Sequence, residues 1–106
     1  MKLKACGLSN PIEIETCVSL NVNYCGFILN YPKSHRYISL NKARELTKIN
    51  KGNTKYVGVL VEPTIKQLNQ FSELNFDYFQ LYGNFHPDEL ISIKDKFKKK
   101  IISTIQ

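Results

Sequence analysis

The chain has 106 residues, a formal net charge of +6 and 42% hydrophobic residues. This length allows one domain at most, and the apolar content is too high for a disordered tail. The apolar runs are too short to cross a bilayer, and Met1 leads into a charged segment without the apolar core of a signal peptide, so we expect a cytoplasmic protein with no membrane partner.

The first strand-like run, Lys2–Cys6, is halted by Gly7. Its last residue is a cysteine, and the glycine after it leaves the chain free to turn. The thiol of Cys6 is thus expected at the carboxyl end of a strand, where α/β proteins build their active sites. We interpret Cys6 as a candidate nucleophile or base.

A helix is expected directly after this turn. Asn10 is a typical N-cap, Pro11 suits the first helical position, and Glu13 completes a capping box. We expect this helix to run to about Asn21. The segment that follows, Tyr24–Leu29, is almost continuously apolar, as in a strand that is buried on both faces.

A second helix is expected from about Ser39 to Asn50, because apolar residues recur there every three positions after a serine that can cap the helix. Tyr56–Val61 is the next buried strand. Thr64 and Gln67 then form a capping-box pattern that starts a third helix. The apolar stripes are Leu40, Ala43, Leu46 and Ile49 in the second helix, and Ile65, Leu68, Phe71 and Leu74 in the third.

The last expected elements are strands at Asp77–Leu81 and Ile101–Ile105 and a helix between them, which carries Leu90, Ile93 and Phe97. Much of the positive charge lies at the end of this helix and in the turn after it, in Lys94, Lys96, Lys98, Lys99 and Lys100. We interpret these lysines as a solvated helix end, because the helix dipole favours cations there. Apart from Phe97 they lack the interleaved aromatic residues of a single-strand binding platform, so we predict no nucleic-acid partner.

Strands and helices therefore alternate along the whole chain, which predicts a parallel sheet with right-handed crossovers. Two α/β architectures fit this pattern. One is a complete five-stranded flavodoxin-like sheet, and the other is the first part of a (β/α)8 barrel. The periodicity does not separate them.

The cysteines are Cys6, Cys17 and Cys25. They form no CxxC pair, and no histidine lies at a metal-binding spacing from them. We expect reduced thiols, with neither a metal site nor a disulfide framework. Cys17 and Cys25 are interpreted as core residues.

Four motifs identify a family resemblance. They are K-A-C-G-L-S-N at Lys4–Asn10, G-F-I-L-N-Y-P-K-S-H-R-Y-I-S at Gly26–Ser39, V-G-V-L-V-E at Val57–Glu62, and Q-L-Y-G at Gln80–Gly83. With these motifs, in this order, the chain resembles phosphoribosylanthranilate isomerase, the barrel enzyme of tryptophan biosynthesis. The resemblance implies a (β/α)8 TIM barrel, in which residues 1–106 are the N-terminal portion of a single domain, with the first four βα units and strand five.

The resemblance also implies a reaction. It is the Amadori rearrangement of N-(5-phosphoribosyl)anthranilate to 1-(2-carboxyphenylamino)-1-deoxyribulose 5-phosphate, which needs no cofactor. A general acid protonates the ring oxygen, and a general base removes the proton from C2 of the ribose. The family's base falls on Cys6. Lys4 lies two residues earlier, on the same strand face, where it is a source of positive potential and a candidate substrate-binding residue.

Two more candidates come from the resemblance. Arg36 matches the arginine that holds the substrate's carboxylate, and a guanidinium suits this role because it donates two parallel hydrogen bonds. Gln80 is expected to point into the mouth of the site. Tyr82 replaces the usual histidine of the family, so no role is carried over to it, and His86 is interpreted as a helix-start residue.

The resemblance places the general-acid aspartate on a sixth strand and the phosphate-binding loops after strands seven and eight. We therefore expect the 106 residues to be inactive alone and to need a C-terminal half-barrel. The alternative is a noncatalytic half-barrel module that self-associates through its open sheet edges.

Overall fold

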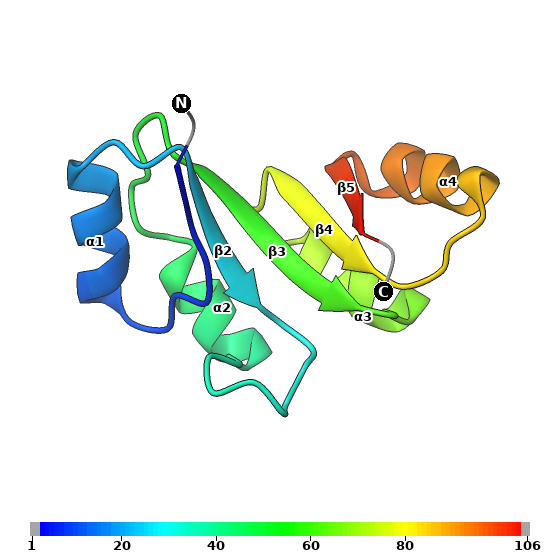
Figure 1. Ribbon diagram of the computed structural model, residues 1–106, viewed down its shortest axis with the longest axis horizontal. Coiled ribbons are helices and arrows are strands. Elements are labelled where there is room, and N and C mark those ends of the chain that lie inside the picture. Colours follow the sequence, from blue (N-terminus) through cyan, green and yellow to red (C-terminus); the bar gives the residue numbers. More distant parts are fainter. Residues whose placement is uncertain (1–2, 105–106) are drawn as a thin grey trace.

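The computed structural model describes residues 3–104, which form one parallel sheet and four helices. The strands are β1 (Lys4–Ala5), β2 (Tyr24–Ile28), β3 (Lys55–Val61), β4 (Tyr78–Tyr82) and β5 (Lys100–Thr104). The helices are α1 (Pro11–Ser19), α2 (Leu40–Leu46), α3 (Ile65–Ser72) and α4 (Pro87–Phe97). In Figure 1 the arrowheads of β2, β3 and β4 point the same way, so their carboxyl ends meet at one edge of the sheet.

The strand order decides between the two architectures. The strands follow one another across the sheet as β1-β2-β3-β4-β5. A flavodoxin-like sheet has the order 2-1-3-4-5 and helices on both faces, so that alternative is wrong. With right-handed crossovers that all step in one direction, every helix packs on the same face, as in a (β/α)8 barrel.

The two faces of the sheet differ in the way this arrangement requires. Side chains that point toward the helices are completely buried, among them Phe27, Tyr56 and Phe79, and they join helix residues in one hydrophobic core. We call the opposite face the inner face. Its residues include Lys4, Tyr24, Gly26, Ile28, Val57, Val59, Tyr78, Gln80 and Tyr82, which alternate with the core residues along their strands.

The helix starts agree with the expected caps. Asn10, Ser39 and Thr64 are N-caps whose side chains accept a hydrogen bond from the backbone three residues later, and His86 caps α4. The ends are less well predicted, since α1 and α2 stop at Ser19 and Leu46, earlier than expected. The predicted ends at Lys2 and Ile105 lie outside the described residues.

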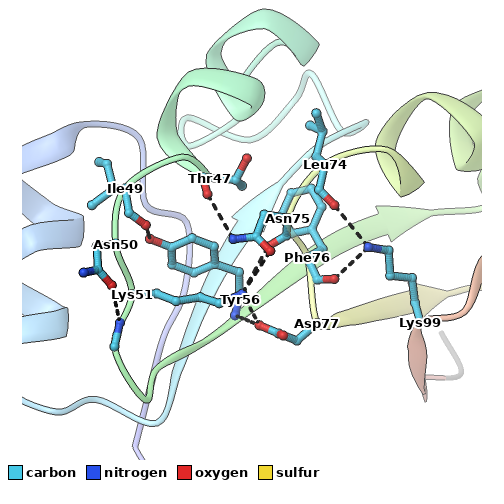
Figure 2. A network of polar contacts seen from close by, with 11 residues as sticks. Thr47, Ile49, Asn50, Lys51, Tyr56, Leu74, Asn75, Phe76, Asp77 and Lys99 are labelled. Carbon is cyan, nitrogen blue, oxygen red and sulfur yellow. Dashed lines mark hydrogen bonds and ion pairs between the residues drawn. The ribbon is translucent and has the colours of Figure 1, made fainter.

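The exposure of two side chains differs from expectation. Ile65 is 54% exposed, although the rest of its stripe is buried, because it lies in a hollow beside the start of α4. Lys99 was expected in solvent, and that prediction is wrong. Its ammonium donates to the carbonyl oxygens of Leu74 (3.1 Å) and Phe76 (2.8 Å), as Figure 2 shows, and burial lowers its pKa. The left-handed conformation of Lys98 (φ 56°) turns the chain inward at this point.

Lys99 belongs to a polar network at the amino ends of β3 and β4 (Figure 2). At its centre the carboxylate of Asp77 accepts from the Lys51 ammonium at 2.8 Å and from the Tyr56 backbone amide at 2.9 Å. The Tyr56 hydroxyl donates to the carbonyl of Ile49 at 2.9 Å. Burial opposes ionisation of Asp77, but the hydrogen bonds from Lys51 and Tyr56 outweigh it and hold the pKa of Asp77 below its ordinary value.

Replacing Asp77 by asparagine is expected to lower the free energy of unfolding by about 2 kcal/mol, the scale of a charge-assisted hydrogen bond. Because the pKa of Asp77 is lowered in the folded state, its contribution is present above the unfolded pKa and is lost as the pH falls through the folded pKa. Urea unfolding at about pH 7 and about pH 3 checks this, since the difference between Asp77→Asn and the parent should shrink in acid. The exposed Asp95→Asn is the control, and an equal loss there would contradict the assignment.

In the described part of the chain, no helix is both long and apolar enough to cross a membrane.

Candidate active site

The Cys6 thiol lies directly after β1, at the carboxyl edge of the sheet, and is exposed. The chain beyond it stays beside β2, since the Leu8 amide donates to the carbonyl of Gly26 at 3.1 Å. The other two cysteines have different surroundings. Cys25 is completely buried, and burial raises its pKa to about 12, whereas Cys17 is half-buried against the core. Cys6 is therefore the most exposed of the three thiols.

Arg36 lies against the turn that follows Cys6. Gly7 has φ 71°, and a Cβ at this position would lie 2.9 Å from both Cβ and Cγ of Arg36. Both the backbone conformation and the lack of space thus require glycine. The loop that carries Arg36 is returned to the sheet by a hydrogen bond from the Ile38 amide to the Ile28 carbonyl, at 3.0 Å. The structure therefore brings Cys6 and Arg36 to the same corner of the sheet.

The Arg36 guanidinium is paired with a residue that sequence reasoning assigned to helix capping alone. Its Nη1 lies 3.0 Å from Oε2 of Glu13, while Oε1 of Glu13 accepts from the Ser9 amide at 3.0 Å. The hydrogen bond from the Ser9 amide lowers the pKa of Glu13, and the contacts with Arg36 lower it further. Partial burial acts in the opposite direction, but the pKa stays below its ordinary value. Glu13 does not turn back to the Asn10 amide, so the expected capping box is replaced by this bridge. Arg36 keeps further N–H donors for a ligand, and 56% of its side chain is exposed.

Lys4 and Gln80 meet on the inner face although β2 and β3 separate their strands. The Lys4 ammonium donates to Oε1 of Gln80. At the other end of the same amide, Nε2 of Gln80 donates to the Tyr82 hydroxyl at 3.1 Å. The structure thus joins Lys4, Gln80 and Tyr82 in one chain of hydrogen bonds.

A cavity of about 330 Å³ opens beside Tyr82, at the carboxyl ends of β2, β3 and β4. It is lined by Ile28, Tyr31, Ser34, Val59, Val61 and Tyr82. Asn30 fixes its wall, because its side chain donates to the Val61 carbonyl (2.9 Å) and accepts from the Val61 amide (2.6 Å). Sequence reasoning did not select Tyr31, Ser34 or Asn30. The sequence does hold one signal for Asn30, because it is a polar residue that comes immediately after a buried strand.

Residues 3–106 match the sequence profile described as N-(5'phosphoribosyl)anthranilate (PRA) isomerase. The chain belongs to this isomerase family. An N-(5'-phosphoribosyl)anthranilate isomerase of Rhizobium etli (strain CIAT 652) is 37% identical over 93 residues, which are 87% of this chain and 41% of the relative. The isomerase of Streptococcus mutans serotype c (strain ATCC 700610 / UA159) is 32% identical over 106 residues, 99% of this chain and 52% of the relative.

The fold agrees with this family. A crystal structure of phosphoribosyl anthranilate isomerase in complex with reduced 1-(o-carboxyphenylamino)-1-deoxyribulose 5-phosphate superimposes with a TM-score of 0.80 and 27% identity, over 97% of this chain and 52% of that chain. The chain is thus of the (β/α)8-barrel type, with four βα units and a fifth strand described. It spans about half the length of the isomerase relatives it matches.

Among residues 3–104, no group of three or more His, Cys, Asp or Glu side chains is placed to hold a metal ion.

Proposed function

We propose that residues 1–106 are the N-terminal portion of a single (β/α)8-barrel domain that acts as a phosphoribosylanthranilate isomerase in the cytoplasm. Its substrate is a small phosphorylated molecule, N-(5-phosphoribosyl)anthranilate, and its reaction is the Amadori rearrangement. The observation that carries the proposal is the corner formed by Cys6 and Arg36, where the stem of the arginine packs on Gly7 directly after the exposed thiol.

In this proposal Cys6 is the general base. An acid first protonates the ring oxygen, and the bond between this oxygen and C1 breaks to leave an iminium. The Cys6 thiolate then takes the proton from C2, so that an enolamine forms. The Lys4 ammonium lies on the same face of the sheet, where it donates to Gln80. The rearrangement consists of proton transfers, which side chains supply without a cofactor.

Arg36 is proposed to bind the carboxylate of the anthranilate ring. Glu13 holds one end of the guanidinium, and the remaining N–H groups can donate to a second carboxylate. Gln80 and Lys4 are proposed to contact the substrate from the inner face. The general acid and the phosphate-binding loops would come from later strands of the barrel.

Assembly with a C-terminal half-barrel tests the function. The 106-residue chain is mixed with the C-terminal half of the Streptococcus mutans isomerase, and turnover of N-(5-phosphoribosyl)anthranilate is followed. Neither half alone is expected to turn over the substrate, because an acid and a base must act together. The mixture is expected to do so, and the chain is expected to self-associate less in it, because the sheet edges at β1 and β5 become paired.

The control is the same mixture with a Cys6→Ala chain. A stable complex of the two halves without turnover would count against the isomerase. Self-association of the chain alone that persists in the mixture would favour the half-barrel module instead.

A further inference from the structure

The contact between Lys4 and Gln80 reaches across three strand spacings, from β1 to β4. Three spacings amount to about 14 Å in a flat sheet. The side chains of a lysine and a glutamine meet over this span only where the sheet curls around its inner face and nothing between them blocks the way. The residues that β2 and β3 present on this path therefore matter.

Gly26 provides the path across β2. Its φ lies outside the left-handed region, so its backbone alone would accept any residue. A Cβ at Gly26 would lie 3.4 Å from Cε of Lys4 and 3.6 Å from Cα of Cys6. The stem of Lys4 thus crosses β2 over Gly26, beside the backbone of Cys6, and a branched side chain would occupy this space.

The amide of Gln80 has to face one way for this contact. An amide carries an acceptor at one end and two donors at the other, and an ammonium needs the acceptor. The donor-only ammonium of Lys4 therefore takes Oε1 of Gln80, and Nε2 at the other end donates to the Tyr82 hydroxyl at 3.1 Å. The reversed amide would direct its NH2 group at the ammonium and lose the hydrogen bond to Lys4, whereas the Tyr82 hydroxyl could donate to Oε1 instead.

We propose that Tyr82 is a positioning residue of the isomerase. Its hydroxyl anchors one end of the Gln80 amide. Gln80 in turn holds the Lys4 ammonium on the inner face, with the lysine stem beside the backbone of Cys6. The proposal rests on the proposed function in that Cys6 is the base. The contacts themselves lie within this chain, so they can be tested without turnover.

The test follows the ammonium hydrogens of Lys4 by ¹H–¹⁵N NMR in the 106-residue chain, with the resonance assigned through its loss in Lys4→Arg. Replacing Tyr82 by phenylalanine is expected to speed their exchange with water about threefold to tenfold, the equivalent of one ordinary hydrogen bond. Gln80→Leu should have the same effect, because it removes the acceptor directly. Tyr82→His should restore slow exchange, since a neutral imidazole offers an acceptor nitrogen to Nε2 of Gln80.

Tyr78→Phe is the matched control, because it removes a hydroxyl from the same face of the same strand, two residues before Gln80. Unchanged exchange in Tyr82→Phe, or an equal change in Tyr78→Phe, would overturn the proposal. The second arm measures turnover of the assembled halves. Tyr82→Phe should lower kcat about threefold to tenfold, whereas Tyr78→Phe should leave kcat unchanged. Suppose that Tyr82→Phe speeds exchange of the Lys4 ammonium hydrogens but the assembled parent halves show no turnover. This result would refute the isomerase function but not the positioning of Lys4. If the assembled halves turn over the substrate but Tyr82→Phe does not change the exchange of the Lys4 ammonium hydrogens, only the positioning of Lys4 is refuted.

Discussion

Replacing Cys6 by alanine is expected to lower kcat of the assembled isomerase by about 10² or more, the usual scale for the loss of a general base. The exposed position of Cys6, after β1 and beside Arg36, is the reason to assign it this role. Because the thiolate would act on the reacting C2 and not on the carboxylate or the phosphate, kcat and kcat/KM should fall together while KM changes little. Steady-state kinetics over a range of substrate concentrations separates the two parameters.

The remaining cysteines serve as controls for this measurement. Cys25 is completely buried and stays protonated, since its pKa is raised to about 12, so it cannot act as the base at neutral pH. Cys25→Ala is expected to lower the free energy of unfolding by about 1 kcal/mol, through a small cavity, and to leave kcat unchanged. Cys17→Ala should likewise leave kcat unchanged. Near-parental turnover of Cys6→Ala would remove the base assignment.

Replacing Gly7 by alanine is expected to cost about 3 kcal/mol of folding stability and to raise KM about tenfold or more. One part of this cost is backbone strain, because φ at Gly7 is 71°. The other part is the 2.9 Å approach to Cβ and Cγ of Arg36, which forces the arginine away from the turn. If Arg36 binds the substrate carboxylate as proposed, a displaced guanidinium no longer reaches it, and KM should rise.

Gly52→Ala separates these two causes. Gly52 also has a positive φ (54°), but the nearest atom to its Cβ position is Cγ1 of Val18 at 3.9 Å. This variant should therefore lose only about 1 kcal/mol, from strain alone, with KM unchanged. Urea unfolding and steady-state kinetics on both variants provide the comparison. Equal losses of stability, with no change in KM for Gly7→Ala, would show that Arg36 is not held by this contact.

The order of the elements could be predicted from the sequence, because caps, apolar stripes and short buried runs are local signals. The choice between barrel and flavodoxin-like sheet could not be made from periodicity, since it depends on which strands become neighbours. The structure decides it through the sequential strand order. Ile65 and Lys99 were misjudged for a related reason. The surroundings of Ile65 are set by α4, and those of Lys99 by the loop at residues 74–76, and neither segment is close in sequence to the residue it contacts.

The contacts of the candidate site could likewise be predicted only where its residues are close in the sequence. The neighbourhood of Cys6 and Gly7 follows from consecutive residues, and the shared face of Gln80 and Tyr82 follows from the strand period of two. The bridge between Glu13 and Arg36 joins residues 23 positions apart, and each had a sufficient local explanation. The contact between Lys4 and Gln80 depends on register across the sheet and on the missing side chain of Gly26. Neither the register nor the glycine can be inferred from the sequence around Lys4 or around Gln80.

The position of the Lys51–Asp77 network has a consequence for how this protein can change. The network lies before β4, and Tyr82 lies at the end of β4, about 16 Å further along the strand. Ion pairs of this kind can be exchanged for well-packed apolar groups without loss of stability. Substitutions can therefore replace the ion pair at the amino end of the sheet without touching the candidate site at the carboxyl end.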